Sequence, residues 1–197
     1  MTEMDNFSEK ESLQLITEMI GKAKKSYVTK GIAPIMWGSI IIFCSMATWV
    51  KFHYKINMGV VWLLTIIAIV PQVYFSIKEN KKRGFASYEG NTLSAVWIAF
   101  SVSIFITSFY FGTHKVSGDS SSLFMMLYAI PTFITGVVTK FKPMMYGGIF
   151  CWIASITSMY TTLEADFLLM AACGLFAWLI PGIILWNRYK KIISTSV

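Results

Sequence analysis

The side chains that could do chemistry are few, and they lie at the edges of long apolar segments. Two histidines and three acids occupy short polar connections: His53, His114, Asp119, Glu164 and Asp166. Imidazole and carboxylate groups are ligands for divalent cations, so these residues would form a site if their connections converged. No recognised metal-ligand spacing links them, and isolated polar residues are common in loops. We therefore expect exposed loop residues and no bound metal.

The apolar segments lack the groups on which enzymes and ion-coupled carriers depend. No Asp, Glu, Lys, Arg or His falls in the middle of any of them. Charge inside a membrane is retained mainly where it acts in transport, proton transfer or voltage sensing. The H-E-x-x-H and G-x-S-x-G motifs and a pair of intramembrane aspartates are also absent. The sequence thus predicts a protein that is not an enzyme and that uses no cofactor.

The polar groups within the apolar segments are hydroxyls and one amide. Four of them are candidates for the lining of a path for a small neutral solute: Thr65, Gln72, Thr132 and Thr135. Hydroxyl and amide groups also hydrogen-bond between membrane helices. We favour that structural role and keep the polar lining as the alternative.

The three cysteines, Cys44, Cys151 and Cys173, lie inside apolar segments. No C-x-x-C spacing occurs, and no pair lies in a polar loop where an oxidising compartment would favour a disulfide. We interpret them as small packing residues.

The composition requires lipid as part of the solvent. Of the 197 residues, 55% are hydrophobic and 16% are aromatic, which is more apolar surface than a soluble domain of this size hides. A membrane-spanning helix needs about 20 mostly apolar residues. Six windows meet this requirement: 32–51, 58–77, 93–112, 122–139, 144–161 and 167–187.

An internal repeat organises these windows into three tandem helical hairpins. An aromatic residue opens the first helix of each hairpin, and a proline lies in the second helix. The distance from aromatic residue to proline is 34 residues (Trp37 to Pro71), 34 (Trp97 to Pro131) and 35 (Tyr146 to Pro181). Unrelated hairpins have no reason to share this spacing, so we interpret it as repetition.

The basic residues predict the orientation. If the N-terminus is cytoplasmic, 14 of the 17 basic residues lie on the cytoplasmic side, and only Lys51, Lys55 and Lys115 lie outside. Lys and Arg are retained on the cytoplasmic side during insertion. Both termini and the 78–92 connection are therefore predicted to be cytoplasmic. The net charge of +7 is then a topology signal with a contribution from anionic lipid, and it requires no nucleic acid.

The first 31 residues are polar and contain a predicted amphipathic helix from about Glu9 to Tyr27. Its apolar stripe includes Leu13, Ile16, Ile20 and Tyr27, and basic residues including Lys24 and Lys25 come late in the helix. Such a helix could lie on the cytoplasmic leaflet with its lysines near anionic head groups. The alternative is that it packs against a cytoplasmic protein partner or its own copy in a homo-oligomer.

Three short motifs open the chain: Glu11-Ser12-Leu13-x-Leu15-Ile16-Thr17-x-Met19-Ile20, Lys24-Lys25 and Met36-Trp37-Gly38. In these motifs and in its layout, the chain resembles a group of small, uncharacterised bacterial six-span inner-membrane proteins with a cytoplasmic N-terminal amphipathic helix. The resemblance covers mainly the first 40 residues and the topology. It implies a location in the bacterial cytoplasmic membrane and brings no assigned activity.

The sequence as a whole predicts an all-α, multi-pass membrane protein. Residues 1–31 would form the cytoplasmic amphipathic helix and linker, residues 32–187 a six-helix transmembrane domain, and residues 188–197 a short basic cytoplasmic tail. We expect an accessory or regulatory role in which the N-terminal helix engages the leaflet or a partner. The alternative is a small transporter or channel-like protein for a neutral or lipid-like solute.

Overall fold

The fold is a bundle of long helices, seen in a computed structural model that describes residues 31–57, 59–82, 88–113 and 120–194. These residues form helices, turns and irregular connections, and no strand occurs among them. The elements are α2 (Ile32–His53), α3 (Leu63–Lys82), α4 (Tyr88–Thr113), α5 (Ser121–Val138), α6 (Lys142–Ser158), α7 (Leu163–Cys173), the π-helical segment η1 (Gly174–Leu179) and α8 (Ile180–Ser194). The predicted all-α fold class is confirmed.

Four helices in the described part of the chain are long and apolar enough to cross a membrane. They cover residues 32–53, 90–113, 121–138 and 163–192, the last of these being α7, η1 and α8 joined end to end. We call this composite helix the C-terminal rod. The other two predicted windows hold shorter elements, because the apolar part of α3 is Leu63–Ile77 and α6 has 17 residues. The described residues therefore support a helical membrane protein with four long candidate spans.

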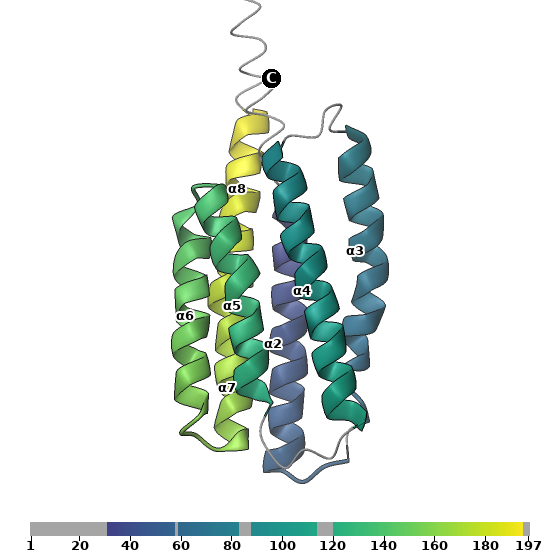
Figure 1. Ribbon diagram of the computed structural model, residues 1–197, viewed down its shortest axis with the longest axis vertical. Helices are drawn as coiled ribbons and strands as arrows, with labels where there is room; N and C mark the ends of the chain where they lie inside the picture. Colours follow the sequence, from purple (N-terminus) through teal and green to yellow (C-terminus); the bar gives the residue numbers. More distant parts are fainter. Residues whose placement is uncertain (1–30, 58, 83–87, 114–119, 195–197) are drawn as a thin grey trace, which may run out of the picture.

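Successive helices run alternately up and down, so the chain crosses the bundle repeatedly (Figure 1). The start of α2 lies beside α8, since a Cβ built on Gly31 would collide with the carbonyl oxygen of Gly182. We call this end, which also holds the turn 139–141, the α8 end of the bundle. The opposite end, with the connection 159–162 between α6 and α7, is the α7 end.

Packing is uneven among the helices. It is most extensive between α5 and α6 and between α2 and the C-terminal rod, whereas α3 and α4 touch their neighbours more sparingly. The most apolar part of α4 has no buried residue. The helices that the sequence pairs within the first two hairpins, α2 with α3 and α4 with α5, are thus not the pairs that pack most closely.

Glycines explain which helices pack closely, because they let two backbones approach. A Cβ on Gly147 of α6 would lie 2.6 Å from the Cα of Ala177 in the rod. A Cβ on Gly38 of α2 would lie 2.7 Å from the backbone nitrogen of Leu179. Between α5 and α6, a Cβ on Gly148 would lie 2.8 Å from the Cβ of Phe133. Helix interfaces in membranes are enriched in such small residues, since close backbone contact provides much of the attraction there.

We expect Gly147→Ala to destabilise the protein and Gly112→Ala to leave its stability unchanged or slightly increased. The added methyl group at 147 meets backbone atoms of the rod, and overpacking of this kind costs about 1–3 kcal/mol, whereas nothing lies within 4 Å of the corresponding position at Gly112. Thermal unfolding in detergent should show a midpoint lower by about 2–8 °C for the first variant only. Equal midpoints for the two variants would contradict the close approach of α6 to the rod.

Candidate functional site

The residues predicted for contact with the leaflet or a partner, namely Leu13, Ile16, Ile20, Lys24, Lys25 and Tyr27, lie outside the described residues. The candidate polar lining can be placed in full. Its four residues lie on α3 (Thr65 and Gln72) and on α5 (Thr132 and Thr135).

Each of these four polar groups makes a hydrogen bond within the protein. The hydroxyl of Thr65 donates to the carbonyl oxygen of Trp62 at 2.6 Å. The Gln72 amide oxygen accepts from the indole nitrogen of Trp37 at 3.2 Å, and this bond joins α3 to α2. A polar group that already has a partner has less need of water in an apolar environment.

The two threonines of α5 each accept a hydrogen bond from an indole. The Thr135 hydroxyl oxygen accepts from Trp97 of α4 at 3.2 Å and donates to the carbonyl oxygen of Pro131 at 2.6 Å. The Thr132 hydroxyl oxygen accepts from Trp178 of η1 at 2.8 Å and donates to the carbonyl oxygen of Tyr128 at 2.7 Å. Three tryptophan indoles thus donate hydrogen bonds to polar side chains that lie one to four residues after Pro71 or Pro131.

Trp178 is the centre of a buried aromatic cluster. Its side chain is 4% exposed, and its ring centroid lies 5.1 Å from that of Tyr128, 6.2 Å from that of Trp97 and 6.5 Å from that of Phe100. Trp97 and Phe100 come from α4, so this contact attaches α4 to the bundle. We call Trp97, Phe100, Tyr128, Thr132 and Trp178 the Trp178 cluster.

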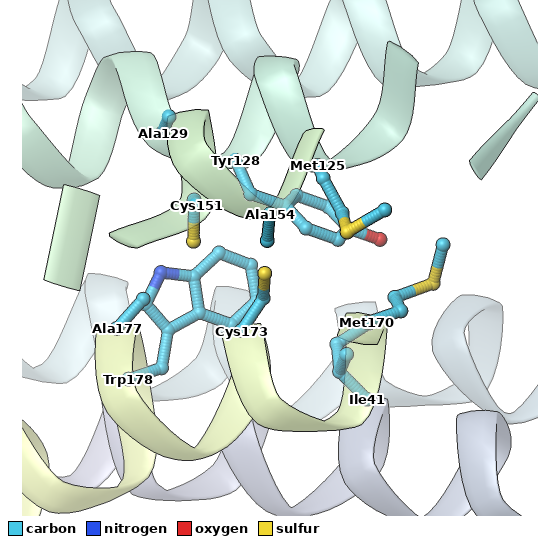
Figure 2. Close-up of a cluster of buried hydrophobic side chains, with 10 residues drawn as sticks. All are labelled: Ile41, Met125, Tyr128, Ala129, Cys151, Ala154, Met170, Cys173, Ala177 and Trp178. Atoms are coloured by element: carbon cyan, nitrogen blue, oxygen red, sulfur yellow. The ribbon is translucent and has the colours of Figure 1, made fainter. Parts of the chain in front are cut away.

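The cysteines border this cluster. All three are free and buried, as expected for packing residues. Cys151 on α6 and Cys173 on α7 both belong to the buried core around Trp178. Figure 2 shows the side chains of Cys151 and Cys173 beside that of Trp178. The Trp178 cluster joins α4, α5 and η1 through ring contacts and the hydrogen bond from Trp178 to Thr132.

A change of helix type positions Trp178. The segment Gly174–Leu179 is π-helical and precedes Pro181, which has no backbone N–H to donate to the carbonyl four residues earlier. A π-helical turn holds one residue more than an α-helical turn and occurs often at functional sites. Pro181 is evident from the sequence, whereas no residue pattern marks the π-helical turn.

The α7 end of the bundle brings together two of the five predicted loop ligands. The Nδ1 atom of His53 lies 3.3 Å from the Oε2 atom of Glu164, and both side chains are half exposed. The His53 ring also stacks on Trp49, with ring centroids 4.9 Å apart. His114 and Asp119 lie outside the described residues.

The prediction that Asp166 is an exposed loop residue is wrong. Asp166 lies in the first turn of α7 and is 1% exposed. Its Oδ1 atom accepts a hydrogen bond from the hydroxyl of Thr161, and its backbone nitrogen donates to the carbonyl oxygen of Thr162 at 3.0 Å. A carboxylate is favourable there because a helix N-terminus carries partial positive charge. The described residues contain no group of three or more His, Cys, Asp or Glu side chains able to hold a metal ion.

Comparison of the chain with protein-family models, curated proteins and solved structures finds no match. The geometry of the bundle is therefore the basis of the functional argument.

We expect Thr132→Val to destabilise the protein, because the substitution leaves the Trp178 indole N–H without an acceptor inside the bundle. An unsatisfied buried donor costs about 1–3 kcal/mol, and hydrogen bonds between membrane helices are worth up to about 2 kcal/mol. The matched control is Thr157→Val, since the exposed Thr157 hydroxyl bonds only to the carbonyl oxygen of Ile153 in its own helix. Thermal unfolding should show a lower midpoint for Thr132→Val than for Thr157→Val. An equal loss of stability in the control would show that the hydrogen bond from Trp178 contributes no more than a bond within one helix.

Proposed function

We propose that this chain is a non-enzymatic integral membrane protein of accessory or regulatory type. The observation that carries this proposal is the use of Gln72, Thr132 and Thr135 as acceptors for tryptophan indoles. A solute path would need such groups turned toward water, and a catalytic site would need titratable groups near them. Here the polar side chains connect helices, which suits a protein that acts through contacts with other membrane components.

The proposal includes six spans built as three tandem hairpins. The 17 residues of α6 rise about 26 Å, close to the apolar thickness of a thin bilayer. Trp37 bonds to the residue after Pro71, and Trp97 bonds to the residue four positions after Pro131, so the opening tryptophan of each of the first two hairpins is tied to the region just after its proline. The third spacing of 35 residues, from Tyr146 to Pro181, exceeds the other two by one. A π-helical turn between these residues accounts for one additional residue.

The orientation that we propose places the α8 end in the bacterial cytoplasm, with both termini on that side. Eight described basic residues lie at this end: Lys78, Lys81, Lys82, Lys140, Lys142, Arg188, Lys190 and Lys191. Only Lys51 and Lys55 lie at the α7 end of the described chain. This asymmetry agrees with the retention of basic residues in the cytoplasm and with the resemblance to bacterial inner-membrane proteins.

A small transporter for a neutral or lipid-like solute is the second candidate. The sparse packing of α3 and α4 favours it, because the most apolar part of α4 has no buried residue and α4 is held mainly through the Trp178 cluster. A helix attached in this way could move relative to the denser unit of α2, α5, α6 and the rod. If variants without a working N-terminal helix keep every associated protein, this candidate becomes the better one.

The orientation is tested by labelling single cysteines in a background without the native ones. Cysteines at Asn57, Ser120 and Leu163 should react with an impermeant thiol reagent added outside intact cells, and a cysteine at Ser87 should not. The reason is the 14 to 3 division of the basic residues. Labelling at position 87 together with protection of the other three positions would show that the protein has the opposite orientation.

The accessory role is tested by replacing Leu13, Ile16 and Ile20 with Asp. This change removes the apolar stripe while the spans keep their own orientation signals, so we expect normal membrane yield and monodispersity with loss of co-purifying protein or of leaflet contact. The matched control replaces Gln14, Glu18 and Lys22 on the opposite predicted face with Ala. Deletion of residues 1–28 should act like the stripe variant. Retention of all associated proteins would refute docking by this helix, and aggregation of the deletion variant would indicate that the helix belongs to the bundle.

A further inference from the structure

Three basic residues lie at the α8 end on or against the turn that joins α5 to α6. The guanidinium carbon of Arg188 on α8 lies 5.2 Å from the centre of the Phe141 ring. Phe141 is buried, and its chain neighbours Lys140 and Lys142 are both exposed. The contact with Phe141 therefore places the Arg188 guanidinium against the turn whose backbone carries both lysines. We call Lys140, Lys142 and Arg188 the basic cluster.

The turn itself fixes the two lysines. The backbone nitrogen of Phe141 donates to the carbonyl oxygen of Gly136 at 2.8 Å, and that of Lys140 donates to the carbonyl oxygen of Val137 at 3.1 Å. Lys140 adopts a left-handed conformation with φ of 52°, which non-glycine residues rarely adopt. The turn thus has a defined geometry, and cation–π contact with Phe141 holds Arg188 against it.

No acid neutralises the basic cluster among the side chains that the structure describes. The acids among those side chains are Glu164 and Asp166, which lie at the α7 end. The first turn of α6, which begins at Lys142, contains no acidic residue. Among the described side chains, the positive charge of the cluster therefore has no acidic partner, and its chemical complement is an anion.

An apolar stripe begins one helical turn from the cluster and runs along α6. Its members are exposed and follow spacings of three, four and three residues: Tyr146, Ile149, Ile153 and Ile156. The rod also has exposed apolar residues: Phe176, Ile180 and Ile183. The rings of Phe150 and Phe176, 4.9 Å apart, join α6 to the rod. Positive charge is thus continuous with an apolar surface that extends across the bundle.

We propose that the basic cluster and this stripe form a binding site for one anionic phospholipid. The phosphate group binds Arg188, Lys140 and Lys142, and the acyl chains lie along α6 and the rod. A guanidinium suits the phosphate because it donates two parallel hydrogen bonds, and basic sites between membrane helices bind anionic head groups. We assign the phosphate to a lipid because the acyl chains of a lipid would contact the apolar stripe, whereas a free phosphate ion would not. This site goes beyond the accessory role and does not depend on which compartment the α8 end faces.

The test is native mass spectrometry of the full-length protein in a neutral detergent. Dioleoyl phosphatidylglycerol should bind at least about fivefold more tightly than dioleoyl phosphatidylcholine, the difference expected from one cation at a membrane surface. The double variant Lys142→Gln and Arg188→Gln should remove this preference. The control variant Lys51→Gln and Lys55→Gln loses the same charge at the α7 end and should keep the preference.

Loss of the contact between Arg188 and Phe141 could disturb folding in the first double variant. A second double variant, Lys140→Gln with Lys142→Gln, keeps that contact. It should weaken binding of phosphatidylglycerol without a change in the thermal midpoint of the lipid-free protein. Unchanged binding in either folded cluster variant would overturn the proposal. An equal loss in the control would overturn it as well, because it would indicate general attraction by charge. Binding of glycerol phosphate as tight as that of the lipid would overturn the assignment to a phospholipid.

Discussion

The closeness with which two helix backbones approach is the constraint on which this bundle depends. Lipid tails are as apolar as the side chains that they touch, so burial of apolar surface cannot drive helix association inside a bilayer as it does in water. Dispersion contacts between closely packed atoms must supply the attraction, and each is small. Gly38, Gly147 and Gly148 lie where another helix leaves no room for a Cβ. The helices that lack such contacts, α3 and α4, are also the least buried.

Internal satisfaction of polar groups is the second constraint, and it gives α3 and α4 their attachment. An indole N–H in hydrocarbon needs an acceptor, and the available acceptors lie beyond Pro71 and Pro131. The bonds of Trp37 to Gln72 and of Trp97 to Thr135 therefore stabilise the contacts that glycines do not. The dense part of the bundle is held mainly by shape, whereas the peripheral helices are held by directional bonds at a few points. Directional bonds at few points permit larger motion than extended backbone contact.

Periodicity and composition were enough to predict the helices, because an apolar run of membrane length has few other stable conformations. The pairing of the helices was harder to predict. Tandem hairpins suggest that the two helices of each hairpin pack together, whereas glycine positions favour α5 with α6 and α2 with the rod. The sequence marks Trp37 and Trp97 as residues that open hairpins, but their hydrogen bonds depend on partners 35 and 38 residues away. The burial of Asp166 could not be predicted, because a polar connection does not indicate whether the first turn of the next helix is covered by the rest of the bundle. The structure does not describe residues 1–30, so the predicted N-terminal helix stays a prediction.

The π-helical segment reconciles these constraints within the C-terminal rod. Two close approaches join α2 to the rod, at Gly31 with Gly182 and at Gly38 with Gly174. They are separated by seven residues on α2 (31 to 38) and by eight on the rod (174 to 182). Seven residues are about two α-helical turns, so an eighth residue would rotate the second glycine out of the interface. The wider π-helical turn absorbs that residue, keeps both glycines against α2 and directs Trp178 toward Thr132. The same local irregularity thus preserves the backbone contact and places the buried indole that holds α5 to the rod.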